Sequence, residues 1–431
     1  MSHTTAEERR RLERLNRPQL AKYQLARLNQ LLAAIVPQNS FYAEKLADMP
    51  RQLESLEQLA ELPLTTKEEL SENSDLPANL TWPMERYVRY HQTSGTRGRP
   101  LAVLDTQEDW QWWVDCWQYV LDSAKVSERD RALLAFSFGP FIGFWSAHDA
   151  LVDRRTLVIP GGGTSSVGRL ELIGRTGATA LFCTPTYALH LAEVAAENKI
   201  DLASSSQVRK IIVAGEPGGS IPATRSRIES AWRARVTDHS GASEVGPWGF
   251  GDASGTGLHV LESEFVAEFI SVETGKSAEQ GELAHLVLTP LGRFGMPVIR
   301  YQTGDLVRPT WPTEGENHFV LLEGGVLGRA DDMFVVRGVN IFPSSIEEIL
   351  LGFPEVVEYR FTLRKQGELD EMLLDVEDQL EQPARIAEEL NLRLGLKVEV
   401  RQAAPHSLPR NEGKGQRFID LRGGVDDCPT D

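Results

Sequence analysis

The residue types best suited to chemistry in this sequence gather between Tyr90 and Thr106, in the stretch YHQTSGTRGRPLAVLDT. Hydroxyl residues and glycines alternate there, so several backbone N–H groups and hydroxyls can turn toward one point, as an oligophosphate requires. The residues concerned are Thr93, Ser94, Gly95, Thr96 and Gly98, with Arg97 and Arg99 beside them. The stretch lacks the Gly-Lys-Ser/Thr ending of a Walker loop. Because such a cluster is more often a solvated turn, other motifs must support a phosphate site.

Four further motifs contain residues that could complete a nucleotide site. Glu244 lies in DHSGASEVGPWGF, and a carboxylate near phosphates is a natural ligand of magnesium. Asp305 follows a glycine turn in YQTGDL, and an aspartate that accepts two hydrogen bonds suits a ribose diol. Arg329 lies in GRADD, and Lys414 lies between two glycines in LPRNEGKGQR, where its ammonium could bridge two anions. Each of these residues, taken singly, could equally be an ordinary loop or surface residue.

The composition argues against several classes of function. The chain of 431 residues has 45 basic and 62 acidic residues and a net charge of −17, which disfavours non-specific binding to nucleic acid or to an anionic membrane. Cys116, Cys183 and Cys428 lack the spacing of a zinc site or a redox pair, which predicts a reducing compartment. The N-terminal stretch is charged, unlike a signal peptide, and Pro140 interrupts the longest apolar run. We therefore expect a cytoplasmic protein.

Strand-length apolar runs, each followed by a helical pattern, repeat in the first part of the chain. The runs cover 131–138, 155–163, 178–185 and 208–219. This repetition predicts a largely parallel sheet covered by helices, with ligands at the carboxyl ends of the strands. From Gly257 to Leu306 the segments become shorter and β-rich, which predicts an antiparallel or barrel-like addition. The tryptophan-rich helix expected after Asp105 is more often core or interface than a ligand site.

The two ends of the chain have different patterns. Helical spacing runs from Ala6 to about Asp48, and PLTTKEEL predicts a capped helix start. After residue 332 we expect a hairpin, a helix with a capping box from Ser344 to Glu347, two strands, a second helix and a final strand over 397–403.

The predicted fold class is α/β. A large N-terminal domain, residues 1–327, has mainly parallel sheets covered by helices plus a β-rich subdomain. A hinge over 328–331 leads to a small, mobile α+β C-terminal domain over 332–431.

Taken in order, six motifs resemble those of the adenylate-forming superfamily: TSGTRGRP, AGEP, SGASEVGP, YQTGDL, GRADDMFVVRGVNIFPSSIEEI and LPRNEGKGQR. The chain is most similar to the phenylacetate-CoA ligase branch, from about Phe41 to Asp420. The resemblance implies that ATP activates a carboxylic acid to an acyl-adenylate with loss of pyrophosphate, and that a thiol, usually coenzyme A, then takes the acyl group. Because the carboxylate is already a nucleophile, the enzyme has to position it and neutralise charge.

The resemblance also implies a role for each motif. The implied nucleotide-binding residues are Thr93, Ser94, Gly95, Thr96 and Gly98 at the β- and γ-phosphates, Gly215, Glu216, Pro217, Asp238, Ser240, Gly241, Ala242 and Ser243 around adenine, and Asp305 and Arg329 at the ribose. Glu244 would hold magnesium, and Lys414 would bridge the carboxylate and the α-phosphate, with Arg329 assisting. The small domain would then rotate about Asp331 and present Gly338 beside a pantetheine tunnel.

Two departures from the family pattern concern the nucleotide. Ser240 stands where the family usually has an aromatic residue that stacks on adenine. Arg97 replaces a loop threonine and Arg99 a lysine, and Arg97 adds a cation near the pyrophosphate. Both departures leave the reaction class in place and bear on nucleotide affinity.

The acid pocket is expected to draw on apolar residues next to strand ends, which suits an aryl or arylacetic acid. These residues are Phe136, Phe138, Phe141, Ile142 and Ala214. Each of them, taken singly, could equally be a core residue. His148 could contact a polar ring substituent or be a buried histidine with its hydrogen bonds satisfied.

Three functions follow from these patterns. The first is an aryl-acid CoA ligase whose partners are a carboxylic acid, ATP, Mg²⁺ and coenzyme A. The second is an enzyme that hands its adenylate to a carrier-protein thiol or an amine. The third is a regulatory nucleotide-binding protein with a degenerate site, which retention of Glu244, Asp305, Arg329 and Lys414 disfavours. The sequence leaves the oligomeric state open, and the resemblance is compatible with a homodimer because relatives in this branch are often dimers.

Overall fold

The structure is a computed structural model that describes residues 4–71, 76–93, 100–136, 139–143, 145–252, 254–330, 333–336, 339–366, 369–408 and 417–422. The chain divides into two compact units, Met1–Val326 and Leu327–Asp431. In the described ranges no helix has both the length and the apolar composition needed to cross a bilayer.

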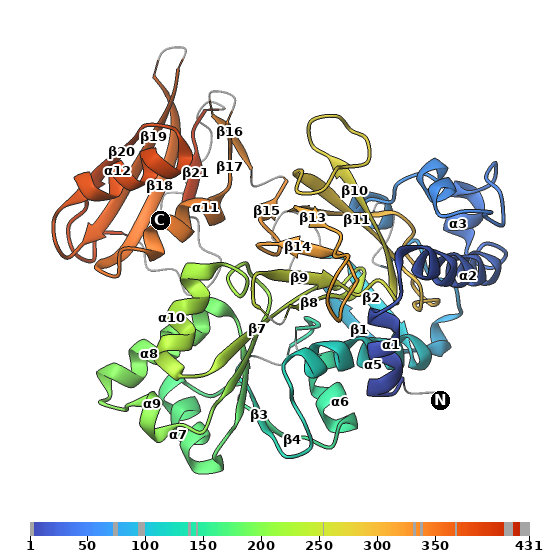
Figure 1. Ribbon diagram of the computed structural model, residues 1–431, viewed down its shortest axis with the longest axis horizontal. Coiled ribbons are helices and arrows are strands. Elements are labelled where there is room, and N and C mark those ends of the chain that lie inside the picture. Colours follow the sequence, from blue (N-terminus) through green and yellow to red (C-terminus); the bar gives the residue numbers. More distant parts are fainter. Residues whose placement is uncertain are drawn as a thin grey trace. The chain divides into compact units, whose positions relative to one another are not determined.

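Within the described residues, the first unit is built on a nine-stranded sheet in the order β13-β14-β9-β8-β7-β6-β5-β3-β4 (Figure 1). Its parallel half consists of β3 (Arg131–Leu134), β4 (Leu157–Pro160), β5 (Ala180–Cys183), β6 (Lys210–Val213) and β7 (Arg235–Ala242). Its antiparallel half consists of β8 (Gly246–Gly251), β9 (Gly257–Val260), β13 (Pro309–Thr310) and β14 (Leu321–Glu323). The repeated apolar runs predicted β3, β4, β5 and β6 correctly, whereas β7 is not among them, and the antiparallel half begins at β8, earlier than expected.

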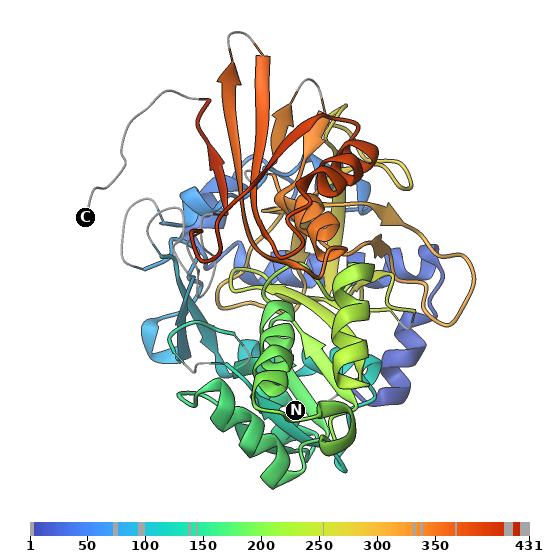
Figure 2. The same cartoon turned by 90° about the vertical axis from the view of Figure 1, so that its left-hand side faces the viewer.

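Helices cover both faces of the parallel half (Figures 1 and 2). One face packs against α5 (Gln107–Ser123) and α6 (Trp145–Asp153), and the other against α7 (Ser166–Thr176), α8 (Pro185–Glu197), α9 (Leu202–Ser205) and α10 (Pro222–Trp232). Successive strand side chains alternate between the two faces. Phe182 belongs to the core cluster of the α5 face, whereas Cys183 belongs to that of the α8 face. Trp110, Trp113 and Trp117 of α5 are buried, which confirms the prediction that the tryptophan-rich helix belongs to the core.

Two smaller sheets complete the first unit. β10 (Phe265–Ser271), β11 (Ala284–Pro290) and β12 (Tyr301–Val307) pair antiparallel, and β1 (Tyr87–Gln92) and β2 (Ala102–Thr106) form a hairpin. The helical segments before and between them are α1 (Ala6–Glu13), α2 (Arg17–Ile35), α3 (Ser40–Lys45), α4 (Lys67–Ser71), and the 3₁₀ helices η1 (Glu57–Glu61) and η2 (Met84–Arg86). The helical pattern predicted from Ala6 is divided among three helices because the side chains of Asn16 and Asn39 cap the starts of α2 and α3.

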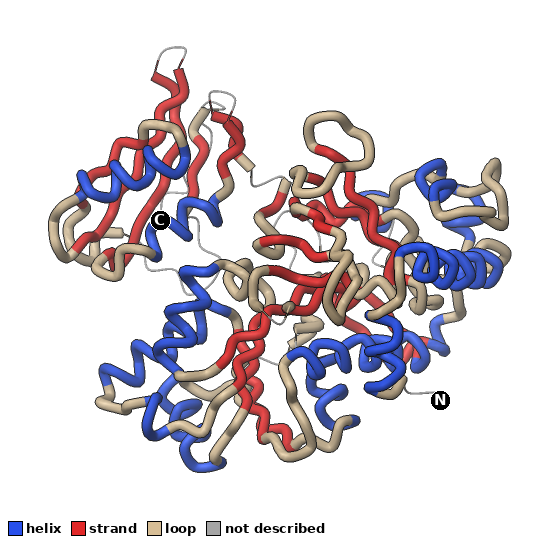
Figure 3. Tube along the Cα trace, viewed as in Figure 1, coloured by secondary structure: helices blue, strands red, loops and turns tan. Residues whose placement is uncertain are grey.

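The second unit is an α+β domain (Figure 3). It contains β15 (Gly328–Arg329), the hairpin β16 (Phe334–Val336) and β17 (Val339–Ile341), and the helices α11 (Pro343–Leu351) and α12 (Pro383–Leu394). In the described part its sheet has the order β20-β19-β18-β21, from β18 (Val356–Gln366), β19 (Leu369–Asp378), β20 (Val398–Gln402) and β21 (Phe418–Asp420).

Two sequence predictions for this unit were wrong. The capping box from Ser344 is absent because α11 already begins at Pro343, with Phe342 as its N-cap, so Ser344 lies in the first turn. The strand at 397–403 is not the last, because β21 follows it and pairs in parallel with β18. β21 has three residues, too few for a recognisable alternation of apolar and polar positions.

Candidate active site

The candidate phosphate loop is carried by the hairpin of β1 and β2. The N–H of Thr93 donates to the carbonyl oxygen of Leu101 at 3.0 Å, and Thr93 Oγ1 accepts from the N–H of Leu101 at 2.9 Å. This reciprocal pair closes the hairpin directly beside the loop. The remaining predicted loop residues, Ser94, Gly95, Thr96, Arg97, Gly98 and Arg99, lie outside the described residues.

Glu244, the candidate magnesium ligand, lies in the turn between β7 and β8. The N–H of Val245 donates to the carbonyl oxygen of Ala242 at 3.2 Å, which closes the turn. The carboxylate is largely buried, and its Oε1 lies 3.3 Å from Nζ of Lys67, the first residue of α4. Sequence reasoning missed Lys67 because its motif indicated only a helix start, which Thr66 and Glu69 do form through reciprocal capping bonds.

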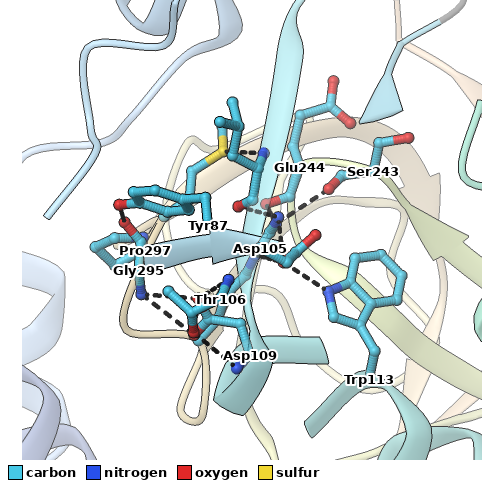
Figure 4. A network of polar contacts seen from close by, with 12 residues as sticks. Tyr87, Asp105, Thr106, Asp109, Trp113, Ser243, Glu244, Gly295 and Pro297 are labelled. Carbon is cyan, nitrogen blue, oxygen red and sulfur yellow. Dashed lines mark hydrogen bonds and ion pairs between the residues drawn. The ribbon is translucent and has the colours of Figure 1, made fainter. Parts of the chain in front are cut away.

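Arg293 attaches the Glu244 turn to the hairpin of β1 and β2. Figure 4 shows Asp105, Ser243 and Glu244 of this network close together. Arg293 Nη1 donates to the carbonyl oxygens of Ser243 and Glu244 at 3.0 and 2.8 Å. Its Nε and Nη2 lie 2.8 and 2.7 Å from Oδ1 of Asp105 in β2, and both side chains are fully buried. Trp113 donates its indole N–H to the same oxygen at 3.1 Å. Because charged hydrogen bonds in a buried site are directional and strong, they fix the position of the Glu244 turn relative to the hairpin of β1 and β2.

The segment that follows Arg293 is itself anchored to α5. The N–H groups of Phe294 and Gly295 donate to Asp109 Oδ1 at 2.7 and 3.2 Å, and Asp109 also belongs to the capping box of α5 with Thr106. No local sequence pattern indicated Arg293, because its partners come from distant elements.

Asp238 lies in β7, where the parallel pairing with β6 ends, and it binds the segment that follows β6. Val213 of β6 lies level with Asp238, so residues 215–217 begin beside it. Ser220 Oγ donates to Asp238 Oδ2 at 2.6 Å. A side chain at Gly219 would come within 2.5 Å of the Asp238 carboxyl group, so this close approach requires glycine. The predicted adenine-binding residues of β6 and β7 are therefore adjacent.

The other residues predicted around adenine lie on the same strand ends. Glu216 Oε1 accepts hydrogen bonds from the N–H and Oγ1 of Thr186, at the start of α8, at 2.7 and 2.6 Å. Ser240 is half-buried and pairs with Gly249 of β8. Gly215, Pro217 and Gly241 are exposed.

Burial of Asp238 predicts an unusual pH dependence of stability. Burial raises the pKa of this carboxyl group to about 6, although hydrogen bonds from Ser220 and from the N–H of His239 lower it. The folded protein then binds a proton as the pH falls through 6, whereas the unfolded chain binds it near pH 4. The contribution of Asp238 to the free energy of unfolding therefore increases from pH 7 to pH 4.5 and is lost as the pH rises through 6.

Urea unfolding of the wild type and of Asp238→Asn at pH 7.0, 5.5 and 4.5 measures this effect. The free energy of unfolding of the wild type minus that of Asp238→Asn should increase as the pH falls. A difference independent of pH would contradict the prediction.

Asp305 lies in β12, in a different sheet of the first unit, and one prediction about it was wrong. YQTGDL forms a bulged strand instead of a turn: residues 303–305 lie opposite one residue of β11, and Gly304 has a φ of +77°. The N–H of Asp305 donates to Thr303 Oγ1 at 3.0 Å, and the side chain is half-buried. Gln302 of β12 donates its N–H to the carbonyl oxygen of Thr65 at 3.0 Å, two residues before Lys67.

The remaining predicted residues of the nucleotide site belong to the second unit. Arg329 lies in β15 and is exposed. Lys414, Asp331 and Gly338 lie outside the described residues, so the bridging, hinge and tunnel roles stay predictions.

The predicted acid-pocket residues lie at the carboxyl ends of β3 and β6. Phe136, Ile142 and Ala214 are half-buried and pack against the core cluster of the α5 face. Phe141 is 48% exposed, and Phe138 lies outside the described residues. His148 is half-buried instead of buried, and its Nδ1 lies 2.9 Å from a carboxylate oxygen of Asp149.

The arrangement around Glu244 fits a magnesium ion held mainly by a nucleotide. The described ranges contain no group of three or more histidine, cysteine, aspartate or glutamate residues that could hold a metal ion. Magnesium commonly uses one or two carboxylates together with substrate phosphates and water. Glu244 already faces one cation, Lys67, and can supply such a carboxylate.

Comparison with known proteins shows the family to which the chain belongs. The family model for AMP-binding enzymes matches residues 24–263, and the model for the AMP-binding enzyme C-terminal domain matches residues 338–422. The phenylacetate-coenzyme A ligase of Thermus thermophilus is 30% identical over 95% of this chain and 98% of its own length. That of Escherichia coli is 31% identical over 86% of this chain and 87% of its own.

Solved structures agree with this assignment. A 2-hydroxyisobutyryl-CoA ligase in the postadenylation state, in complex with R3-HIB-AMP, has a TM-score of 0.89 at 27% identity and covers 97% of this chain and 94% of its own. The same ligase with 2-HIB-AMP and CoA in the thioesterification state has a TM-score of 0.72 at 28% identity, over 97% of this chain and 94% of its own. The protein is thus an acid–thiol ligase that uses ATP and forms AMP. The chain belongs to the AMP-binding enzyme family, in the branch that resembles phenylacetate-coenzyme A ligase.

Proposed function

We propose that this enzyme converts an aryl or arylacetic acid to its adenylate and then to its coenzyme A thioester, with Glu244, Lys414 and Arg329 in the reaction centre. The observation that supports it most directly is the attachment of the Glu244 turn to β2 through Arg293. A metal-binding carboxylate and a phosphate loop that are held together can act on one triphosphate. Magnesium, when bound, supplies positive charge next to the phosphates.

The first half-reaction needs few protein groups. A carboxylate oxygen of the acid attacks the α-phosphorus of ATP, and the bond from that phosphorus to the pyrophosphate oxygen breaks. Lys414 bridges the carboxylate and the α-phosphate, so its ammonium offsets the charge that repels the two anions. Residues 215–217, Asp238 and residues 240–243 hold adenine, Asp305 binds the ribose hydroxyls, and Arg329 assists at the ribose and phosphate.

The second half-reaction uses the same active site in a different arrangement. The thiol sulfur of coenzyme A attacks the acyl carbon, the thiol proton is lost, and the carbon–oxygen bond to AMP breaks. Rotation about Asp331 withdraws Lys414 and brings Gly338 beside the pantetheine arm.

The nature of the acid is supported by the apolar residues at the strand ends. Phe136, Ile142 and Ala214 are half-buried on one face of the sheet, where they can contact a carbon skeleton. The relatives named above act on phenylacetate and on 2-hydroxyisobutyrate, so the test must include aromatic and aliphatic acids.

Exchange of labelled pyrophosphate into ATP tests the first half-reaction without a thiol. We expect exchange that depends on an added acid, with aryl and arylacetic acids most active. Absence of exchange with every acid of a broad panel would overturn the proposal. Adding coenzyme A and measuring AMP release tests the acceptor: a carrier-protein thiol or an amine would be favoured if coenzyme A left AMP release unchanged.

Substitutions at Glu244 and at Lys67 should change the Mg²⁺ concentration required for exchange in opposite directions. Glu244→Gln removes the charge that attracts the metal, so the Mg²⁺ concentration for half-maximal exchange should rise about tenfold or more. Lys67→Met removes a partly exposed competing cation, and because such ion pairs contribute little, that concentration should fall about two- to fivefold. Exchange at saturating ATP and acid, titrated with Mg²⁺, measures both. An increase for both variants would show that Lys67 does not compete with the metal.

A further inference from the structure

His239 is a buried histidine of β7 that lies level with a predicted acid-pocket residue. Val213 of β6 pairs with Asp238 of β7, so the next residues, Ala214 and His239, are level and share a face of the sheet. This face packs against α5, because the centroids of the His239 and Trp117 rings are 4.1 Å apart. Ala214 packs against the same core cluster. His239 therefore lies beside the predicted acid-binding wall, on the side of the sheet opposite to the Asp238 carboxylate.

The protonation of the His239 ring is set by its surroundings. Nδ1 lies 2.7 Å from the carbonyl oxygen of Gly249, which can only accept, so Nδ1 carries the proton. Burial lowers the pKa of His239 to about 4, so the ring is neutral at physiological pH. A neutral imidazole with its proton on Nδ1 has a lone pair on Nε2. His239 consequently presents a hydrogen-bond acceptor in a fixed position.

The acceptor nitrogen has no partner within the described part of the chain. His239 is only 7% exposed, and no described residue bonds to Nε2. Nδ1 of His91 also lacks a partner among the described residues, but it is fully buried. Nε2 of His239 is not fully buried, so a ligand can reach it. A Cβ added at Gly241 would lie 3.4 Å from Nε2, so this nitrogen points along β7 toward Gly241. Nε2 therefore keeps a small accessible surface on an otherwise buried residue, and a ligand that reaches it can supply the donor that the described residues do not.

We propose that His239 determines which acids the enzyme accepts, and that its Nε2 accepts a hydrogen bond from a hydroxyl group of the substrate acid. This inference rests on the proposed function and narrows the substrate class to hydroxylated carboxylic acids, aromatic or aliphatic. Phe136 and Ala214 contact the carbon skeleton, and His239 recognises the hydroxyl. A site with a buried acceptor discriminates against an acid that lacks the donor, because the acceptor then stays unpaired.

Pairs of acids that differ by one hydroxyl test the proposal. The pairs are 4-hydroxyphenylacetate and phenylacetate, 3-hydroxybenzoate and benzoate, and 2-hydroxyisobutyrate and isobutyrate. In at least one pair, kcat/KM for acid-dependent pyrophosphate exchange should be about 10- to 100-fold higher for the hydroxylated member. The pair with the largest ratio distinguishes an aromatic from an aliphatic substrate.

Two variants of His239 show whether that preference comes from Nε2. His239→Leu should reduce the ratio of kcat/KM between the hydroxylated acid and its partner to about one, while KM for ATP stays within a factor of about two. His239→Gln keeps an acceptor and should retain part of this ratio. His259→Leu is a matched control, because His259 is also buried and its Nδ1 lies 3.0 Å from the carbonyl oxygen of Phe319. It should leave the ratio unchanged. Thermal unfolding shows whether each variant is folded.

The outcomes separate the two proposals. Exchange with equal efficiency for both members of every pair, or an unchanged preference in folded His239→Leu, overturns the role of His239 and leaves the proposed function intact. No exchange with any acid overturns the proposed function and this inference with it.

Discussion

Lys414→Ala should slow acyl-adenylate formation by about 10²- to 10³-fold, the effect typical of losing one charge-stabilising group in a transition state. The resemblance places this lysine between the carboxylate and the α-phosphate, two anions that repel each other without it. Thioester formation from preformed adenylate and coenzyme A should change by less than about threefold, because the proposed rotation about Asp331 withdraws Lys414 in that step. Single-turnover measurements of AMP release from synthetic adenylate give the second rate, and pyrophosphate exchange gives the first.

Lys397→Ala is the matched control for this experiment. Lys397 is an exposed lysine just before β20 in the same unit, so its removal changes the net charge equally. Both rates should stay within about twofold of wild type, since isolated surface charges contribute little. Equal losses in both half-reactions for Lys414→Ala would refute the bridging role.

Arg293→Met should lower the free energy of unfolding by about 3–5 kcal/mol, the usual effect of removing one partner of a buried ion pair. The side chains of Arg293 and Asp105 are both fully buried, so the variant leaves a carboxylate without its counter-ion. Burial already raises the pKa of Asp105 to about 6 against the opposing effect of Arg293, and loss of the arginine raises it further. The destabilisation should therefore be larger at pH 8 than at pH 5.5, where the folded variant binds a proton. Urea unfolding at the two pH values measures both effects.

Two comparisons show whether this loss comes from the unpaired charge. The double variant Asp105→Leu with Arg293→Met should recover most of the stability, because it leaves no buried charge. Arg14→Met, which breaks an exposed pair with Glu316, should cost much less. A double variant no more stable than Arg293→Met would contradict the explanation.

Arg293→Met should also alter the magnesium requirement. The carbonyl groups of Ser243 and Glu244 lose their anchor to β2, so Glu244 becomes less well positioned. The Mg²⁺ concentration for half-maximal exchange should rise several-fold, measured below the unfolding temperature, whereas Arg14→Met should leave it unchanged. An unchanged value in folded Arg293→Met would show that the pair acts on stability alone.

The sequence by itself determined the fold class and the order of the motifs. Strands β3, β4, β5 and β6 of the parallel half were visible because an apolar run of strand length is a local property, followed at once by a helical period. The starts of α4 and of the hairpin after Met333 were visible for the same reason, since caps and turns involve neighbours within a few residues. The motif order then pointed to one reaction class, which the family comparisons confirmed.

Tertiary structure decided how the site is held and which side chains face it. Arg293 and Asp105 are 188 positions apart in sequence, so only the folded chain shows that they tie the Glu244 turn to β2. The bulge that places Asp305 depends on the register of β12 against β11. Nothing in the sequence distinguished His239 from the other residues of its glycine-rich motif. The carbonyl of Gly249 and the ring of Trp117 define the orientation of its imidazole, and hence the position of Nε2. Periodicity and capping act over a few residues, whereas these contacts depend on which surfaces meet when distant segments pack.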